Sequence, residues 1–288
     1  MEGDEELSLR DAAERLGVHY MTAYRYVRLG RLPARRVGRE WQVRTSDLEA
    51  LLREARKPER QAADDGSSAL GRTRWETHRA RLFNRLVAAD EPGAMTVVEN
   101  AVAAGAAPQD VYMELLAPVL RDIGDRWAAG AVAVAEEHTA TSVAARIVAR
   151  MGPRFNRRGR RRGTVVLAGV AGETHWLPLA LLADVLRGAG WRVVDLGGDT
   201  PTGSVLDAVQ AEGDDLVCVG LSVASRRSLP AAKECVAAVH RRFPSLPVLV
   251  GGPAVKDAAA ARRLGADAWA PNATGAVELL AAGVVRRD

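Results

Sequence analysis

The chain has 288 residues, of which 48% are hydrophobic and 26% are charged. At roughly 150 residues per domain, this length predicts about two folded units, and the composition excludes both a disordered chain and a membrane protein. The start, MEGDEE, is acidic and lacks the apolar core of a signal peptide. We therefore expect a cytoplasmic protein with no membrane partner.

Basic residues are concentrated near the N-terminus. The net charge is only +4, from 40 basic and 36 acidic residues. Residues 24–44, however, hold seven arginines and one acid. A local cluster of this kind favours a polyanionic partner more than the total charge does.

Residues 1–55 form the first predicted domain. Ser8 can cap a helix over LRDAAERLG, and a second helix follows a glycine turn, which is the helix-turn-helix arrangement. The segment LPARRVGREWQVRTSDLEALL then predicts two short strands around Gly38 and a helix capped by Thr45 or Ser46. We expect a winged helix-turn-helix domain.

This domain resembles the winged helix domains of excisionases and MerR-type regulators through SLRDAAERLGV, TAYRYVRLGRLP and RRVGREW. The resemblance implies a double-stranded DNA operator as the partner. Base edges are within reach of the second helix, while phosphates or the minor groove would meet the wing. The helix residues are Tyr20, Thr22, Tyr24 and Arg25, and the wing residues are Arg35, Arg36 and Arg39. A solvated basic face is the alternative, and His19 and Tyr26 are assigned to the surface and to packing.

A linker and a helical segment follow. Residues 56–73 lack apolar periodicity and hold Pro, Gly, Ser and mixed charge, which is typical of a linker. Residues 74–155 show apolar positions spaced by three and four, interrupted at Pro92 and Pro108. We expect four or five short helices in a bundle.

Residues 163–288 change to a period typical of strands. The apolar runs TVVLAGV, WRVVDLG, LVCVGLSV and PVLVGG, with a weaker fifth at Ala268, alternate with helical stretches. These units predict a flavodoxin-like, doubly wound parallel sheet whose ligand site lies beyond the carboxyl ends of the strands. The whole chain is therefore an α/β multidomain protein. Cys218 and Cys235 lie in apolar stretches, so we expect buried free thiols.

Polar and glycine residues follow three of these strands: Glu173, Thr174 and His175, then Ser222, then Gly251 and Gly252. The set resembles cobalamin-binding domains of the methionine synthase type, whose first loop carries D/E-x-H-x-x-G. The resemblance implies that His175 is the lower axial ligand of the cobalt. The chain departs from the pattern at Pro178, where the family has glycine, so the approach of the backbone to the corrin ring is altered.

The residue types agree with this chemistry. A neutral imidazole can coordinate cobalt through one nitrogen while the other donates to Glu173, which orients the ring. Gly251 and Gly252 remove side chains where the nucleotide tail of the cofactor would thread, and Ser222 can hydrogen-bond that tail. A surface-loop histidine is the alternative interpretation.

In the predicted bundle, Trp127 is followed after nine residues by Glu137 and His138. This spacing resembles CarH- and LitR-type repressors, which hold adenosylcobalamin in the dark and lose its adenosyl group in light. Trp127 offers an apolar lid over the upper ligand, and Glu137 can bind ribose hydroxyls. The alternative is a buried core Trp with Glu-His capping a helix, and the other tryptophans Trp75, Trp176 and Trp191 are assigned to packing.

A second departure concerns the light response. Relatives carry a histidine directly after that tryptophan, whereas this chain has Ala128. Either His138 substitutes, or water fills the position, or the protein senses the cofactor without a lasting light response.

These features together predict an adenosylcobalamin-binding, light-responsive transcriptional repressor, not an enzyme. Its cofactor state would control the assembly of a homo-oligomer, a dimer or tetramer, and thereby DNA binding. The alternatives are a light-insensitive cobalamin-sensing transcription factor and a corrinoid carrier module of a methyltransferase or mutase.

Overall fold

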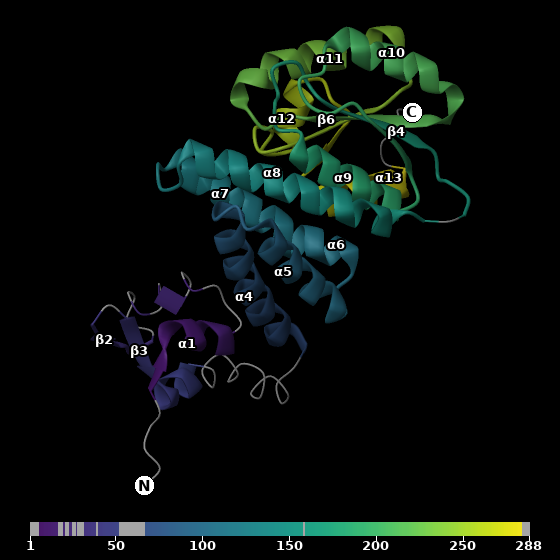
Figure 1. Cartoon of the computed structure of the whole chain (residues 1–288). Helices are drawn as coiled ribbons and strands as arrows, with labels where there is room; N and C mark the ends of the chain where they lie inside the picture. Colours follow the sequence, from purple (N-terminus) through teal and green to yellow (C-terminus); the bar gives the residue numbers. More distant parts are fainter. Residues whose placement is uncertain are drawn as a thin grey trace. The chain divides into compact units, whose positions relative to one another are not determined.

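The computed structural model describes residues 6–16, 20, 23–24, 27, 32–38, 40–51, 67–157 and 159–283. The chain divides into two compact units, residues 1–74 and 75–288, each of which is described by itself (Figure 1). No helix within the described ranges has both the length and the apolar character that a bilayer crossing requires.

The first unit contains a small antiparallel sheet beside a helix. Its elements are β1 (Glu6–Ser8), α1 (Leu9–Arg15), β2 (Arg35–Val37) and β3 (Glu40–Arg44), with strand order β1-β3-β2. The hydroxyl of Ser8 accepts a hydrogen bond from the N–H of Asp11 at 3.2 Å, which confirms the predicted cap. Residues 45–51 are helical. The predicted hairpin around Gly38 is confirmed, whereas β1 was not predicted.

A series of helices, the first of which begins before residue 75, confirms the predicted bundle. They are α4 (Ser67–Val87), α5 (Glu91–Ala103), α6 (Pro108–Asp110), the π-helix η1 (Val111–Leu116), α7 (Ala117–Ala128), α8 (Val134–Met151) and the 3-10 turn η2 (Gly152–Phe155). Asp90 caps α5 by accepting from the N–H of Gly93 at 2.9 Å. Helix α4 begins within the segment that was predicted as a linker.

A proline accompanies the π-helical segment. Pro118 has no N–H, so the carbonyl of Glu114, four residues earlier, receives no α-helical hydrogen bond. The Nε atom of Arg79, from α4, donates to that carbonyl instead at 2.5 Å, and its Nη2 lies 2.7 Å from the Glu114 carboxylate. The N–H of Ala117 reaches back five residues to Tyr112, as a π turn requires.

The rest of the second unit is a parallel sheet between helices. Its strands are β4 (Thr164–Gly169), β5 (Arg192–Asp195), β6 (Leu216–Ser222), β7 (Val248–Gly251) and β8 (Ala268–Ala270). Their order, β5-β4-β6-β7-β8, is the flavodoxin-like order 2-1-3-4-5, which confirms the predicted fold class. The chain leaves β4 toward β5 on one side and continues with β6 on the other, so the topological switch point lies between β4 and β6.

Helices cover both faces of the sheet (Figure 1). Helices α9 (Leu177–Gly188) and α13 (Ala273–Ala282) share one core cluster with the sheet, while α10 (Thr202–Glu212), α11 (Leu229–Arg242) and α12 (Ala258–Arg263) share the other. The short turns η3 (Gly213–Asp215) and η4 (Arg226–Ser228) complete the unit. Cys218 and Cys235 are buried and free, as predicted, and burial raises the pKa of Cys218 to about 12.

The bundle and the sheet share a hydrophobic core. Leu177, Leu181 and Val185 of α9 belong to the same cluster as the buried bundle residues. At this boundary the hydroxyl of Tyr112, which is fully buried, donates to Oδ2 of Asp184 at 2.9 Å. Burial and the neighbouring Asp184 carboxylate raise the pKa of Tyr112 well above its ordinary value of 10.0, so the phenol keeps its proton.

Candidate functional site

Glu173 is the centre of the loop that follows β4. Its side chain is fully buried, with a relative exposure of 0%. Its Oε2 atom accepts hydrogen bonds from the N–H groups of Ala224 and Ser225, both at 2.7 Å. Its Oε1 atom accepts from the N–H of His175 at 3.1 Å and lies 2.5 Å from the imidazole Nδ1. Glu173 thus joins the loops after β4 and β6 across the switch point of the sheet.

The carboxylate of Glu173 is held in its charged form. Burial, the largest influence, acts to raise its pKa. Together, the hydrogen bonds from Ser225, His175 and Ala224 outweigh the effect of burial and hold the pKa of Glu173 below its ordinary value of 4.5. A buried carboxylate with hydrogen-bond donors at both oxygens is therefore stable as an anion at neutral pH.

His175 presents its imidazole to solvent. Its side chain is 59% exposed, and Nδ1 is engaged by Glu173. Because the carboxylate accepts the proton of Nδ1, the neutral ring carries its lone pair on Nε2. The predicted role of Glu173 in orienting this ring fits the geometry, and Nε2 is available to a ligand.

The loop after β5 is hydrogen-bonded to the loop that holds Glu173. Asp199 donates its N–H to the carbonyl of Glu173 at 2.7 Å and accepts from the N–H of Gly172 at 2.6 Å. It does so with a positive φ of 50°, unusual for a residue with a side chain. A Cβ atom on Gly198 would lie 2.8 Å from the same Glu173 carbonyl. Sequence reasoning missed both Asp199 and Gly198.

The residues at the carboxyl ends of β6 and β7 lie at the same edge of the sheet. Ser222 is half-buried, and its hydroxyl has no hydrogen-bond partner among the described residues. Gly252 has a φ of +102°, and a Cβ atom there would lie 2.5 Å from the carbonyl oxygen of Val223. Gly251 would bring its Cβ within 3.0 Å of the Ala270 carbonyl. Close contacts with neighbouring backbone atoms thus favour glycine at both positions. This preference is separate from the predicted room for a cofactor tail.

Around Pro178, the first departure from the family pattern, exposed residues lie on the loop and the first turn of α9. Thr174 is exposed, and Pro178 occupies the first turn of α9, where a missing N–H costs nothing. Trp176 is 44% exposed beside His175, so its assignment to packing is wrong. Trp191, only 8% exposed, confirms that assignment.

On the bundle, Trp127 and Glu137 are not the core-and-cap pair of the alternative interpretation. Trp127 lies in the last turn of α7 with 47% of its surface exposed. Glu136, not Glu137, caps α8 by accepting from the N–H of Ala133 at 2.8 Å. Glu137 instead accepts from the hydroxyl of Thr141 at 2.9 Å. An exposed indole and a carboxylate unused for capping are both available to a ligand.

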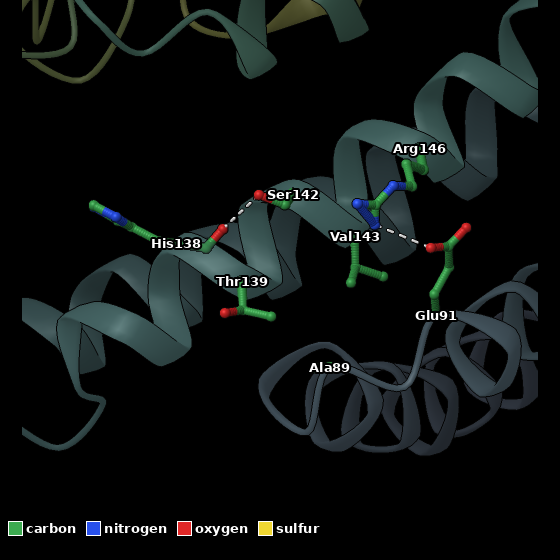
Figure 2. Close-up of a pocket in the computed structure, with 7 residues that line it drawn as sticks. All are labelled: Ala89, Glu91, His138, Thr139, Ser142, Val143 and Arg146. Atoms are coloured by element: carbon green, nitrogen blue, oxygen red, sulfur yellow. Dashed lines mark hydrogen bonds and ion pairs between the residues drawn. The ribbon is translucent and has the colours of Figure 1, made fainter.

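His138 lies at the edge of a hollow between α8 and the turn before α5. Its side chain is 75% exposed, with Nε2 3.6 Å from Glu137 Oε2. The hollow measures about 260 Å³ and is lined also by Thr139, Val143 and Arg146, the last paired with Glu91 at 3.0 Å. Figure 2 shows the His138 ring pointing away from Thr139 and Val143. This hollow is therefore distinct from the edge of the sheet where His175 lies.

In the first unit, the described DNA-contact candidates differ in exposure. Tyr20 is 40% exposed, whereas Tyr24 is half-buried and packs edge-on against Trp41 with 6.4 Å between ring centroids. Arg36 is exposed, and Arg35 forms an exposed ion pair with Glu6 at 2.9 Å. The other candidates, Thr22, Arg25 and Arg39, and also His19 and Tyr26, lie outside the described residues.

The structure thus places the candidate cofactor residues in two groups. Those of the sheet lie at or just after the carboxyl ends of three strands, namely Glu173, Thr174, His175, Ser222, Gly251 and Gly252. Those of the bundle, namely Trp127, Glu137 and His138, lie on α7 and α8. Among the described residues no hydrogen bond or ion pair joins the two groups.

Three families of known domains match this chain. A B12 binding domain matches residues 163–281, a second B12 binding domain matches residues 78–151, and a helix-turn-helix domain matches residues 6–56. The chain therefore combines a helix-turn-helix domain with two B12-binding domains. This confirms the resemblance and the order of modules that the sequence predicts.

Two relatives represent different uses of such domains. The HTH-type transcriptional repressor CarH of Myxococcus xanthus is 34% identical over 200 residues, which cover 69% of this chain and 65% of the relative. The dimethylamine corrinoid protein of Methanosarcina barkeri is 32% identical over 130 residues, which cover 43% of this chain and 59% of that protein. The chain thus spans less than two thirds of either relative.

A solved structure supports the fold of the second unit. The monomethylamine corrinoid protein of Methanosarcina barkeri aligns with a TM-score of 0.64 and 20% identity, covering 71% of this chain and 97% of that chain. At this identity the likeness shows the fold alone.

Proposed function

We propose that this protein is an adenosylcobalamin-dependent transcriptional repressor in which the state of the cofactor controls assembly and DNA binding. The observation that carries the proposal is the exposed His175, whose Nδ1 is fixed by the buried Glu173 at the switch point of the sheet. The helix-turn-helix match in the same chain supports DNA binding as the activity that this site would regulate.

The residues present fit a cobalamin. The His175 ring, oriented through Nδ1, would hold the cobalt of a cobalamin through Nε2. The hydroxyl of Ser222 has no protein partner among the described residues and can bind a polar part of the cofactor. Among those residues, no three His, Cys, Asp or Glu side chains converge as a metal site. His175 would therefore serve as a single protein ligand to a metal that the cofactor itself carries.

The bundle would face the upper side of the cofactor. Adenosylcobalamin, when bound, supplies a cobalt–carbon bond that visible light breaks. Trp127 would cover the adenosyl group with its exposed indole, and Glu137 would accept hydrogen bonds from ribose hydroxyls. Both residues would lose these contacts in light. Because α9 packs into the bundle core, a change at the bundle would also reach the sheet.

DNA affinity would depend on the number of helix-turn-helix domains in the assembly. One domain offers few phosphate contacts. The ion pair between Arg35 and Glu6 is exposed and adds little to the stability of the fold. Several domains in one homo-oligomer raise the effective concentration of each for DNA. A dimer or tetramer held together by the cofactor would therefore bind an operator far better than a monomer does.

The test uses the full-length protein with adenosylcobalamin, kept dark or illuminated. Size-exclusion chromatography and gel shifts on a panel of duplexes should show a larger assembly and tighter DNA binding in the dark. Methylcobalamin, which has no ribose for Glu137, serves as the control ligand and should support less assembly. Identical dark and light behaviour would refute the light response. Cobalamin binding without any DNA binding would favour a corrinoid carrier.

The ligand roles have their own variants. His175→Ala should lose the spectrum of histidine-coordinated cobalamin, and an unchanged spectrum would refute the axial role. His138→Ala tests the second imidazole, because Ala128 offers no ligand after Trp127. A difference from wild type that appears only after illumination would support a role for His138 on the upper side.

A further inference from the structure

A basic cavity lies at the edge of the sheet opposite the His175 loop. It measures about 530 Å³ and lies between residues 156–157 and 159–162, which precede β4, and the turn from α9 to β5. Its walls contain six arginines: Arg157, Arg160, Arg161, Arg162, Arg187 and Arg192. Because β4 and β5 begin here, the cavity is separate from the cofactor residues at the carboxyl ends of the strands.

Most of this positive charge is not neutralised. Arg187 pairs with Asp184 at 2.9 Å, and Arg192 pairs with Glu212. The other four arginines are exposed and have no carboxylate within 4.0 Å among the described residues. The C-terminal end of α9 contributes roughly half a negative charge, so the cavity keeps a net charge of about +3.5.

Backbone hydrogen bonds hold two of these arginines in place. The N–H of Arg162 donates to the carbonyl of Gly190 at 3.0 Å, and the N–H of Arg192 donates to Gly163 at 2.9 Å. Trp191, which is 8% exposed, lines the cavity, and its Nε1 has no acceptor among the described residues. Residues 162 and 163 are therefore held against the turn before β5 and against its first residue.

The chemistry of the cavity favours phosphate groups. A guanidinium is a planar fork that matches phosphate oxygens and stays charged at every physiological pH. The four exposed arginines of this cavity have no carboxylate partner among the described residues. DNA carries a phosphate at every nucleotide, so one duplex can contact several of these guanidiniums at once, whereas a small anion offers a single group.

We propose that this arginine cavity binds the phosphate backbone of double-stranded DNA, independently of sequence and in addition to the wing. The inference rests on the proposed function, because it assumes that the protein binds DNA. It adds a second contact, located on the B12-binding unit itself. Cofactor-dependent assembly would then bring several such cavities, as well as several helix-turn-helix domains, to one duplex.

The test compares two full-length variants that lose the same charge. The cavity variant replaces Arg160, Arg161 and Arg162 with alanine. The matched control replaces three exposed arginines of α11 and α12 with alanine: Arg241, Arg262 and Arg263. Binding to a random-sequence duplex is measured at several salt concentrations, with dark adenosylcobalamin. The cobalamin spectrum reports whether each variant is folded.

The cavity variant should lose up to about 2.7 from the slope of log affinity against log salt, at ~0.9 per phosphate contact. That loss corresponds to an affinity up to roughly 500-fold lower at 0.1 M salt. The control should match wild type. Arg→Lys at the three cavity positions keeps the charge and should restore most of the slope.

A milder variant keeps the test decisive if the triple variant fails to fold. Arg160→Gln with Arg161→Gln spares Arg162, whose backbone pairs with Gly190, and should lose about 1.8 from the slope. Cavity variants with the wild-type slope, or a control with an equal loss, would overturn the inference.

Two further outcomes separate the sources of failure. Tripolyphosphate that binds wild type but not the cavity variant, with an unchanged DNA slope, would assign the cavity to a free anion and overturn the DNA contact. Wild-type protein that binds no duplex in any cofactor state would overturn the proposed function as well. Wild type that binds DNA and responds to cofactor, beside cavity variants that match it, would overturn this inference alone.

Discussion

Replacing Glu173 with glutamine tests whether this carboxylate anchors the site. The buried side chain accepts from donors at both oxygens, two backbone N–H groups at Oε2 and both donors of His175 at Oε1. A glutamine amide has one oxygen and one NH₂ group, so one of its ends must face donors. The orientation with fewer conflicts keeps the oxygen toward the N–H groups of Ala224 and Ser225.

The cost of that orientation can be worked from these bonds. The N–H of His175 loses its acceptor, at about 1–3 kcal/mol, and the bonds to Ala224 and Ser225 lose their charge assistance, at about 1 kcal/mol. We expect Glu173→Gln to lower the free energy of unfolding by about 2–4 kcal/mol, measured by urea denaturation of the cobalamin-free protein at pH 7. The NH₂ group would also donate to Nδ1, which moves the ring proton to Nε2, the nitrogen proposed to coordinate cobalt.

The contribution of Glu173 should also depend on pH. Its pKa lies below 4.5 in the folded protein because its hydrogen bonds outweigh burial. A carboxyl group with a lowered pKa stabilises the fold above its unfolded pKa, and this stability is lost as the pH falls through the folded pKa. The difference between wild type and Glu173→Gln should therefore be constant from pH 7 to about pH 5 and shrink below about pH 4.5.

His175→Ala is the matched control for this variant. It removes the exposed imidazole but keeps the bonds from Ala224 and Ser225 to Glu173. Its free energy of unfolding should stay within about 1 kcal/mol of wild type, while the spectrum of histidine-coordinated cobalamin is lost. Equal urea midpoints and slopes for wild type and Glu173→Gln would refute the anchoring argument.

Two further variants test the packing of the second unit. Tyr112→Phe removes the phenol donor from Asp184, which is only 6% exposed. It should lower the free energy of unfolding, measured in urea, by about 1.5–3 kcal/mol. Unchanged stability would mean that the bond does not help to join bundle and sheet. Gly252→Ala should cost more than Gly105→Ala, since both have a positive φ but only the first Cβ would strike the backbone of Val223. Equal melting temperatures of these two variants would contradict the close approach.

The fold follows from local patterns in the sequence to a large extent. Apolar strands at regular intervals predicted the parallel sheet, and periodic apolar positions predicted the bundle, because both patterns are direct consequences of burial. The strand Glu6–Ser8 was missed because three residues are too few for an alternation to be informative, and the strand depends on pairing with β3. The π turn before Pro118 was missed as well, since the proline signals a break but not that Arg79 fills the freed carbonyl.

The site was predictable only where a side chain itself carries the chemistry. His175 and Glu173 stand out by type and position, because strand ends in a doubly wound sheet converge at one edge. The partners that hold Glu173 through Oε2 are backbone N–H groups, which every residue except proline possesses. The residue types of Ala224 and Ser225 therefore do not reveal this role. Gly252 was detectable as a glycine, but its close contact with Val223 depends on how two loops meet. A short motif therefore identifies the residue that meets the ligand, whereas the residues that hold it in place become visible only in three dimensions.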